Sequence, residues 1–418
     1  PGEPGIGGVS LKLQQLAGGQ YADAGMTTVT AADGSYRFDG LLPGTYRIVE
    51  TQPSGYYSVG AAAGNVDGAV RGSVVNADTI GEISLLGGED SVRNDFAEAA
   101  PAELSGHVYH DADNDGVFDA GENGIAGATV RAIRVLPDGS TAETVTTTSA
   151  ADGSWAASNL RPGQWQVVEV TPPGYLDGLD AAGTAGGTAH NPGDSITGIR
   201  LLSGQVGENY NFGELVPSSI AGRVIADMDG NCLFTPGDIP LAGVTIKLRD
   251  AGGQLIATTT TDSDGRYNFG GLAPGVYSIE ETQPDGYFDG GDHVGTAGGM
   301  KLAPDSIIDI PIASATNATG YDFCEIVPSS ISGRVSADLD GNCRYDAGEP
   351  LLKGVTVHLL DAGGNRIATT TTDVNGEYEF TGLAPGTYGV EEIQPEGYFD
   401  GSDRVGSDGG SLQRPDTI

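Results

Sequence analysis

Residues 258–292 read TTTTDSDGRYNFGGLAPGVYSIEETQPDGYFDGGD. Related versions of this stretch occupy residues 27–60, 146–180 and 369–403. One aromatic position repeats within them at spacings of 119, 112 and 111 residues, and it is filled by Tyr46, Trp165, Tyr277 and Tyr388. A spacing this long suits a whole domain and is too long for one unit of a solenoid. The chain is therefore a tandem array of four related repeats.

Each repeat has the pattern of antiparallel β-structure. In the last copy, GVTVHLLD, RIATTTTD, GEYEFTGL and GTYGVEE alternate apolar and polar residues, which is typical of half-buried strands. Turn residues separate them at 361–364, 375–376 and 384–386, and we expect the Asn-Gly and Asp-Gly pairs to close tight hairpins. The sequence therefore predicts an all-β tandem array of antiparallel β-sandwich domains, arranged end to end.

An acidic loop follows the first strand of the second repeat. Residues 111–122, DADNDGVFDAGE, fit the calcium-loop pattern D-x-[DN]-x-[DN]-G-x5-E throughout. Alternate side chains in a tight loop point oxygens to one side, and a backbone carbonyl and a closing carboxylate complete the shell. The predicted ligands are Asp111, Asp113, Asp115, the carbonyl of Val117, Asp119 and Glu122. An all-oxygen set favours calcium over zinc.

The acidic loop recurs at the same place in the next two repeats. The predicted ligands there are Asp227, Asp229, Asn231, Leu233 and Asp238, and then Asp338, Asp340, Asn342, Arg344, Asp346 and Glu349. Only the last ligand, Glu3, remains in the first repeat. Cys232 and Cys343 replace the glycine of the sixth position, which puts the affinity in question. A single match fits a solvated acidic turn equally well, but three copies in phase favour bound calcium.

A second acidic pair follows the G-Y-[LF] step of three repeats, at Asp177/Asp180, Asp289/Asp292 and Asp400/Asp403. Two interpretations are open: a second ion site, or ordinary Asp-Gly turn chemistry, which the sequence favours.

Short junctions set the predicted boundaries. We expect domains at residues 1–101, 102–217, 218–328 and 329–418, of which the first lacks its opening strand and acidic loop and the last lacks its closing strand. The chain is then either a window on a longer array or part of a fibre in which neighbouring chains supply the missing strands.

The acidic loop, the pattern TTTD-x-x-G-x-Y-x-F-x-x-L-x-P-G-x-Y and the pattern E-x-Q-P-x-G-Y together resemble the SdrD B-like (Cna-B-related) domain over essentially the whole chain. The resemblance implies a prealbumin-like sandwich in a bacterial cell-surface or secreted protein, with a structural role as a calcium-stiffened stalk. Related pilin modules often contain a Lys–Asn isopeptide bond. Lys12 and Lys247 align here with Arg131 and His358, so we expect none.

The cysteines suggest a different cross-link. Cys232 and Cys324 of the third repeat are both replaced by glycine in the second, at Gly116 and Gly213, which favours a disulfide between them. Pairing of Cys324 with Cys343 would leave Cys232 alone, and free buried thiols are a further alternative.

Composition excludes several classes of function. The net charge of −37 repels nucleic acid, and no apolar run is long enough to span a membrane. The five histidines share no phase that would suit zinc, and no nucleophile–base pair recurs, so we predict no enzyme. Trp155 and Trp165 are expected in the core.

The sequence favours a calcium-binding extracellular stalk or fibre whose partners are neighbouring repeats and, in a fibre, like chains. The alternatives are an adhesin for a host or matrix protein or a glycan, and an accessory array of a larger secreted enzyme.

Overall fold

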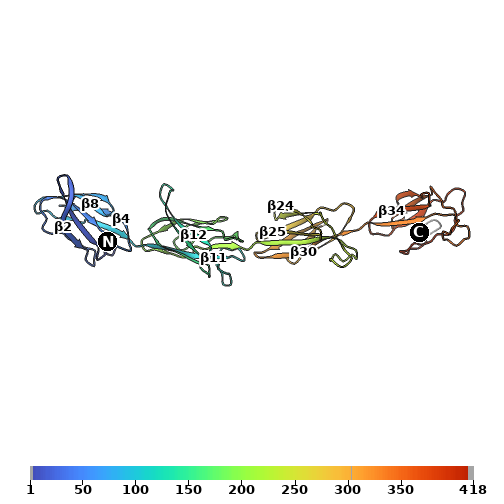
Figure 1. The fold of residues 1–418 in the computed structure, drawn as a ribbon, viewed down its shortest axis with the longest axis horizontal. Coiled ribbons are helices and arrows are strands. Elements are labelled where there is room, and N and C mark those ends of the chain that lie inside the picture. The colour runs from blue at the N-terminus through green and yellow to red at the C-terminus, as the bar shows by residue number, and fades with distance from the viewer. Residues whose placement is uncertain (1–2, 303, 413–418) are drawn as a thin grey trace. The chain divides into compact units, whose positions relative to one another are not determined.

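The computed structural model describes residues 3–302 and 304–412. These residues form strands, turns and loops and contain no α-helix (Figure 1). The chain divides into two compact units, residues 1–217 and 218–418, and each unit holds two of the predicted repeats. Four separate clusters of buried apolar side chains lie within residues 11–85, 102–212, 220–323 and 357–380. The four domain boundaries stay a prediction.

The second repeat is a sandwich of two sheets. The first sheet has the order β13 (Thr141–Thr148), β12 (Thr129–Val135), β15 (Gly163–Val170), β18 (Ser195–Leu201) and β17 (Thr188–His190). The second has the order β14 (Ser154–Leu160), β11 (Ala102–His110), β20 (Phe212–Leu215) and β16 (Leu176–Asp177), and β19 (Val206–Gly207) also pairs with β11.

The third repeat has the same topology. Its first sheet has the order β24 (Leu255–Thr260), β23 (Thr245–Asp250), β26 (Gly275–Glu281), β29 (Ser306–Ile312) and β28 (Met300–Leu302). Its second has the order β22 (Ile239–Pro240), β21 (Ser218–Ala226), β30 (Asn317–Ile326) and β27 (Phe288–His293), with β25 (Arg266–Leu272) also on β21.

The outer repeats contain parts of the same plan. The first repeat has the sheet β2 (Gln20–Val29), β1 (Ser10–Ala17), β3 (Gly44–Glu50), β8 (Thr79–Leu85) and β7 (Ser73–Asn76), the pair β10 (Asp95–Ala99) and β4 (Tyr57–Ala62), and the short strands β6 (Ala69–Val70), β5 (Asn65–Val66) and β9 (Ser91–Val92). The fourth has the sheet β33 (Arg366–Thr371), β32 (Thr356–Leu360) and β35 (Gly389–Glu392), and the pair β31 (Ser329–Arg334) and β34 (Glu377–Leu383).

Most pairings are antiparallel, as predicted, but the opening and closing strands of the two complete repeats are parallel. β11 pairs with β20, and β21 with β30, in parallel register. Each pair joins the two ends of its repeat side by side. The acidic loop leaves the end of the opening strand, so this pairing places the loop beside the end of the closing strand.

The expected tight hairpins form at some Asp-Gly pairs only. Asp67 and Gly68, both with positive φ, join β5 to β6, and residues 138–139 lie in the turn between β12 and β13; each of these strand pairs is antiparallel. The repeated Asp-Gly and Asn-Gly pairs at 152–153, 264–265 and 375–376 instead connect β13 to β14, β24 to β25 and β33 to β34, and the two strands of each connection lie in different sheets. Only the glycine has a positive φ, as at Gly153 and Gly376. The preceding Asp instead accepts backbone N–H groups, so the turn redirects the chain from one sheet to the other.

The cores fill the space between the sheets. On β15, Trp165 and Val167 point inward with the alternation expected of a strand, and the next inward position is Glu169. Trp155 and Trp165 are buried, as predicted, and both indole N–H groups donate to backbone carbonyls. The strand periodicity therefore aims one carboxyl group into each core at the end of an apolar row, and the third repeat does the same with Glu281.

Candidate metal sites

The first carboxylate of each acidic loop organises the turn that follows it. Asp227 accepts the backbone N–H groups of Gly230 and Cys232 at 2.8 and 2.7 Å. Asp338 accepts those of Gly341 and Cys343 at 2.6 and 2.7 Å. In the second repeat, fully buried Asp111 accepts those of Asp115 and Gly116 at 3.2 and 2.8 Å. This side chain therefore fixes the first half of each loop.

The closing carboxylate holds the second half, and it does so identically in all three loops. It accepts the N–H groups of the second and ninth loop residues, at distances of 2.6–3.0 Å. These contacts join Glu122 to Ala112 and Asp119, Asp238 to Met228 and Thr235, and Glu349 to Leu339 and Asp346. The shorter Asp238 makes both contacts, so replacing Glu by Asp does not open the loop.

The fifth and seventh positions are linked as well. The N–H groups of Val117, Leu233 and Arg344, whose carbonyls are the predicted ligands, donate to Asp115, Asn231 and Asn342 at 2.6–2.8 Å. Because each fifth-position oxygen is held by this contact, the loop positions it without help from outside.

An aromatic residue at the eighth position packs each loop onto its opening strand. The ring of Phe118 lies 4.8 Å from the rings of His107 and Tyr109. Arg223 and Arg334, at the place of His107, lie over Phe234 and Tyr345 at 4.1 and 4.7 Å. The sequence analysis did not predict this packing, although an aromatic residue occupies the same loop position in all three copies.

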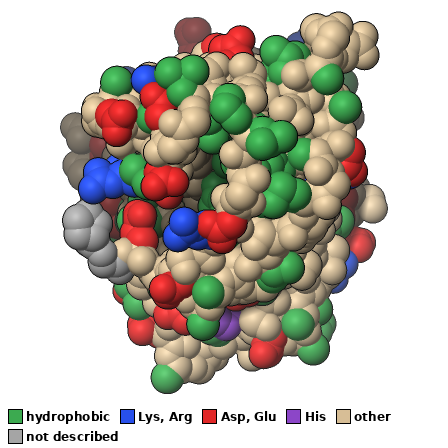
Figure 2. Space-filling view, turned by 90° about the vertical axis from the view of Figure 1, so that its left-hand side faces the viewer, with side chains coloured by type: hydrophobic (Ala, Val, Ile, Leu, Met, Phe, Trp, Pro, Cys, Tyr) green, Lys and Arg blue, Asp and Glu red, His purple; other side chains and the backbone are tan. Residues whose placement is uncertain are grey.

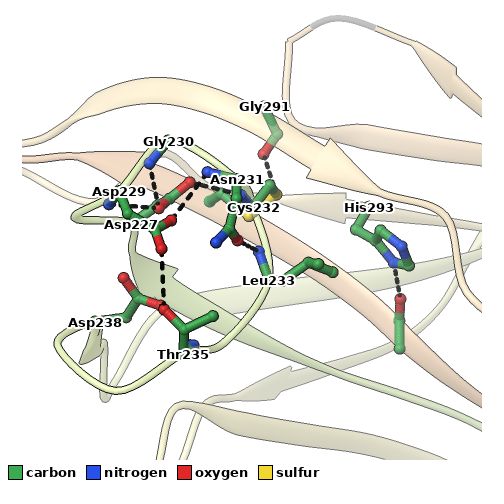
Figure 3. The surroundings of a disulfide bond; sticks show 12 residues. Asp227, Asp229, Gly230, Asn231, Cys232, Leu233, Thr235, Asp238, Gly291 and His293 are labelled. Carbon is green, nitrogen blue, oxygen red and sulfur yellow. Dashed lines mark hydrogen bonds between the residues drawn. A yellow bond between two sulfur atoms is a disulfide. The ribbon is translucent and has the colours of Figure 1, made fainter.

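The loops bring acidic oxygens together. The ligand atoms of Asp111, Asp113 and Glu122 all lie within 4.8 Å of one another, and so do those of Asp113, Asp115 and Asp119. Asp227, Asp229 and Asp238 form the same kind of group (Figure 3). In the described part of the chain, no Lys or Arg ion pair involves a loop carboxylate.

The electrostatics of the first loop position differ between copies. Burial raises the pKa of Asp111, although backbone N–H groups oppose the rise. The N–H of Cys343 and its neighbours hold the pKa of Asp338 below its ordinary value. The donor set is hard and all oxygen, so the residues fit a calcium ion.

The backbone conformation at the sixth loop position explains why the motif has a glycine there. Its φ is +77° at Gly116, +50° at Cys232 and +57° at Cys343, a region that side chains disfavour. Cys232 is joined to Cys324 of β30 by a disulfide across a sequence separation of 92 residues, with Cα atoms 5.5 Å apart (Figure 3). Cys343 is a free thiol that donates to the carbonyl of Ser402 at 2.5 Å.

Other predicted site residues lie apart from the loops. Glu3 is exposed at the start of the described chain. The two lysines considered for an isopeptide bond form ion pairs, Lys12 with Asp23 and Lys247 with Glu280.

The surface is strongly acidic, and on the face in Figure 2 acidic side chains (red) are spread widely among fewer basic ones (blue).

The acidic pairs after the G-Y-[LF] step belong to a second cluster. In the second repeat, buried Asp180 and half-buried Asp177 lie close to Asp194, which meets Glu169 and Glu214. Sequence reasoning missed the last three residues. Their signal was the inward strand position of Glu169 and the repetition of all three in neighbouring repeats.

Comparison with known proteins identifies a matching domain family and several relatives. Residues 1–96, 102–213, 218–306 and 329–413 match the family described as the SdrD B-like domain. The chain is 29% identical, over 97% of its length, to serine-aspartate repeat-containing protein D of Staphylococcus aureus (strain Newman), and 28% identical, over 97% of its length, to serine-aspartate repeat-containing protein F of Staphylococcus epidermidis. It spans only 30% and 23% of those relatives.

Among solved structures, the chain is similar to the Bacillus anthracis TIE protein, with 14% identity, a TM-score of 0.33 and coverage of 95% of this chain and 65% of that one. It is also similar to BcpA, the major pilin subunit of Bacillus cereus, with 13% identity, a TM-score of 0.30 and coverage of 76% and 94%. The described residues include no helix with the length and apolar character needed to cross a membrane.

Proposed function

The chain belongs to the SdrD B-like domain family, and on that premise we propose that it is a structural segment of a stalk or fibre whose β-sandwich repeats are stabilised by calcium bound in the acidic loops. It is extracellular, at the cell surface. No catalytic role is part of the proposal. Its partners are calcium and the neighbouring repeats of the same chain.

The observation that supports the proposal is the identical construction of three loops. In each, the closing carboxylate bridges the N–H groups of the second and ninth residues, and the first carboxylate organises the turn. In the second and third repeats acidic oxygens then converge, and among the described residues no Lys or Arg ion pair offsets them. This arrangement is costly for a loop that binds nothing, because like charges in close proximity oppose folding.

Bound calcium would supply the missing positive charge and join both halves of the loop. Its ligands would be the carboxylate and amide oxygens named above, with Asp119 and Asp346 at the ninth position and Thr235 in their place in the third repeat. Because an ion that binds only the folded state stabilises it by mass action, each site would contribute about 1.4 kcal/mol when free calcium is tenfold above Kd. Millimolar calcium, typical outside cells, suits even a weak site.

Calorimetric titration of the whole chain with calcium tests the proposal. The triple variant D113N/D229N/D340N removes the third-position carboxylate from every loop. We expect it to lose up to three bound ions per chain or to raise their Kd at least tenfold. The matched control D90N/D285N, which neutralises two exposed carboxylates outside the loops, is expected to bind calcium as the natural chain does. Equal binding by the two variants would contradict the proposal.

A further inference from the structure

The first and second repeats lie in one compact unit, residues 1–217, and they contact each other at a junction away from the acidic loops. The turn at 160–163, between β14 and β15 of the second repeat, contains Arg161. The guanidinium carbon of Arg161 lies 4.5 Å from the centre of the ring of Tyr57 in the first repeat. The same guanidinium donates a hydrogen bond to the carbonyl of Ser58 at 3.0 Å. One arginine therefore makes two contacts with β4 of the neighbouring repeat.

Tyr57 contacts the second repeat at its hydroxyl end as well. The hydroxyl donates to the backbone carbonyl of Asn159 at 2.5 Å. The ring is thus bound at its face by Arg161 and at its edge by the backbone of the same turn. Both side chains are half-buried, and exclusion of water strengthens the attraction between a cation and an aromatic ring.

The chain between the two repeats is short, and its backbone is hydrogen-bonded. β10 ends at Ala99 and β11 begins at Ala102, so the connection consists of Ala100 and Pro101. The N–H of Ala100 donates to the hydroxyl of Ser203 at 2.9 Å, and its carbonyl accepts the N–H of Gly204 at 3.1 Å. The proline ring fixes the φ of Pro101. The connection is therefore attached to the second repeat and contains no residue that can turn freely.

The turn at 160–163 has an equivalent in every repeat, but the side chain at its second position differs. In each repeat, an aromatic residue of the following strand donates to the carbonyl of that position at 2.6–2.9 Å. The pairs are Tyr46 with Leu42, Trp165 with Arg161, Tyr277 with Ala273 and Tyr388 with Ala384. This contact with the core fixes the backbone of the turn whichever side chain it carries.

The place of Tyr57 also differs between repeats. Leu176, Phe288 and Phe399 stand there in the second, third and fourth repeats, and none of them has a hydroxyl group. The arginine and the tyrosine hydroxyl thus occur on the two repeats that meet at this junction. The pair therefore matches the first repeat to the second.

The charge of Arg161 also acts on the first repeat. Burial raises the pKa of Glu98 on β10, and the positive charge of Arg161 is one of the effects that oppose this rise. In a chain with a net charge of −37, an arginine of one repeat thus offsets an acidic residue of its neighbour, which favours contact between them.

We propose that the turn at 160–163 is a docking element for the first repeat, and that the Arg161–Tyr57 contact joins the first and second repeats into one rigid unit that unfolds cooperatively. Bending at the junction would have to break the ring contact and the hydrogen bonds to Ser58 and Asn159 together. The stiffness of the array would then be set separately at each junction by the residues at these two places. The inference does not depend on calcium in the acidic loops, because none of the contacting residues belongs to a loop.

The distance between spin labels on the two repeats tests the rigidity. Labels at T27C and T188C, both exposed strand positions, are measured by pulsed electron paramagnetic resonance on the whole chain carrying C343S. The chain has three cysteines, and the Cys232–Cys324 disulfide occupies the other two, so only the new sites are labelled. We expect a narrow distance distribution, which R161A broadens. R131A removes an exposed arginine of the same repeat and is the matched control, for which we expect no change in width.

R161A is expected to fold, because alanine occupies the same turn position at Ala273 and Ala384 and the core contact is made by the backbone carbonyl. All measurements are made at one fixed calcium concentration, so calcium binding by the loops does not alter the comparison. Equal widths for the unaltered chain and R161A would overturn the proposal, and so would equal broadening by R131A.

Tryptophan fluorescence gives a second readout, because both tryptophans, Trp155 and Trp165, are buried in the second repeat. Y57A changes only the first repeat, yet we expect it to raise the unfolding constant of the second repeat about threefold in denaturant. Y57F removes the hydroxyl alone and should act in the same direction but less strongly. V59A shortens an exposed side chain of the same strand and should have no effect. A tryptophan transition that Y57A leaves in place would overturn the proposal.

Discussion

The second and third repeats have the same sheets and the same acidic loop, but they attach that loop to the sandwich differently. In the third, the sixth loop residue is joined covalently to the closing strand through Cys232 and Cys324. In the second, glycines stand at both places, and the loop is held by fully buried Asp111 and by the packing of Phe118. The contrast teaches that the loop can be attached in two ways: by a covalent bond to the closing strand, or by a buried carboxylate together with packing on the opening strand.

Of the changes that test this comparison, removal of the disulfide is expected to have the largest effect on stability. The variant C232S/C324S loses a cross-link that closes a loop of 92 residues, which we expect to destabilise the third repeat by about 4 to 5 kcal/mol from loop-closure entropy. Denaturant unfolding of the whole chain should show one transition moving to lower denaturant. The control C343S changes a free thiol and should leave it in place. Coincident curves for the natural chain and C232S/C324S would contradict the expectation.

Between pH 6 and pH 8, the titration of Asp180 and that of Asp292 should differ when a chelator removes metal. A carboxyl whose folded pKa is raised stabilises the fold fully below its unfolded pKa of 3.8, and this stability is lost as the pH rises through the folded value. For Asp180 the loss continues to about pH 8, and for Asp292 it ends near pH 6. Each such group contributes a slope of up to about 1.4 kcal/mol per pH unit.

The variants D180N and D292N isolate these slopes. With chelator, D180N should remove part of the pH dependence of unfolding between pH 6 and pH 8, and D292N only the part below pH 6. Stability that rises with pH in this window in the natural chain would refute the sign of the prediction.

The sixth loop position offers a smaller test. Gly116 has a φ of +77°, and a Cβ there would lie 3.2 Å from Cβ of Leu179. We expect G116A to destabilise the second repeat by about 1 to 2 kcal/mol, because alanine disfavours this backbone region. G139A, at a turn glycine with a φ of +84° and open space around it, controls for the backbone cost alone. Greater stability of G116A in denaturant would show that the loop changes its backbone freely.

The smallest effect is expected at the closing ligand. D238E gives the third loop the longer carboxylate present at Glu122 and Glu349. We expect its calcium Kd to fall about threefold, or by about 0.7 kcal/mol, in calorimetric titration. An unchanged or weaker affinity would mean that Asp238 already has the required reach.

Most of the fold could be predicted because its signals are local and repeated. The strands follow from alternation, and the inward positions of Trp155 and Trp165 follow from their alignment with other aromatic residues. The parallel pairing of β11 with β20 could not be read locally, because it joins the two ends of a repeat. The hairpin prediction failed at the pairs 152–153, 264–265 and 375–376, because Asp-Gly or Asn-Gly specifies a turn but not the sheet that the next strand enters.

The candidate sites divide in the same way. The acidic loop is contiguous, so its spacing alone predicts a set of candidate ligands. The buried triad draws Glu169, Asp194 and Glu214 from three separate segments, and only the folded sandwich brings their oxygens together. Glutamate side chains usually lie at the surface, so in the sequence Glu169 resembles an ordinary polar residue near the end of a strand. Only the structure shows that its side chain points inward.

Thermal unfolding of the whole chain, with millimolar calcium and then with chelator, tests most directly the claim that calcium stabilises this extracellular array. We predict a large fall in melting temperature on chelation, which D113N/D229N/D340N shows only in part and D90N/D285N shows in full. Equal melting temperatures in calcium and in chelator would contradict the account and would leave the acidic loops as ordinary turns.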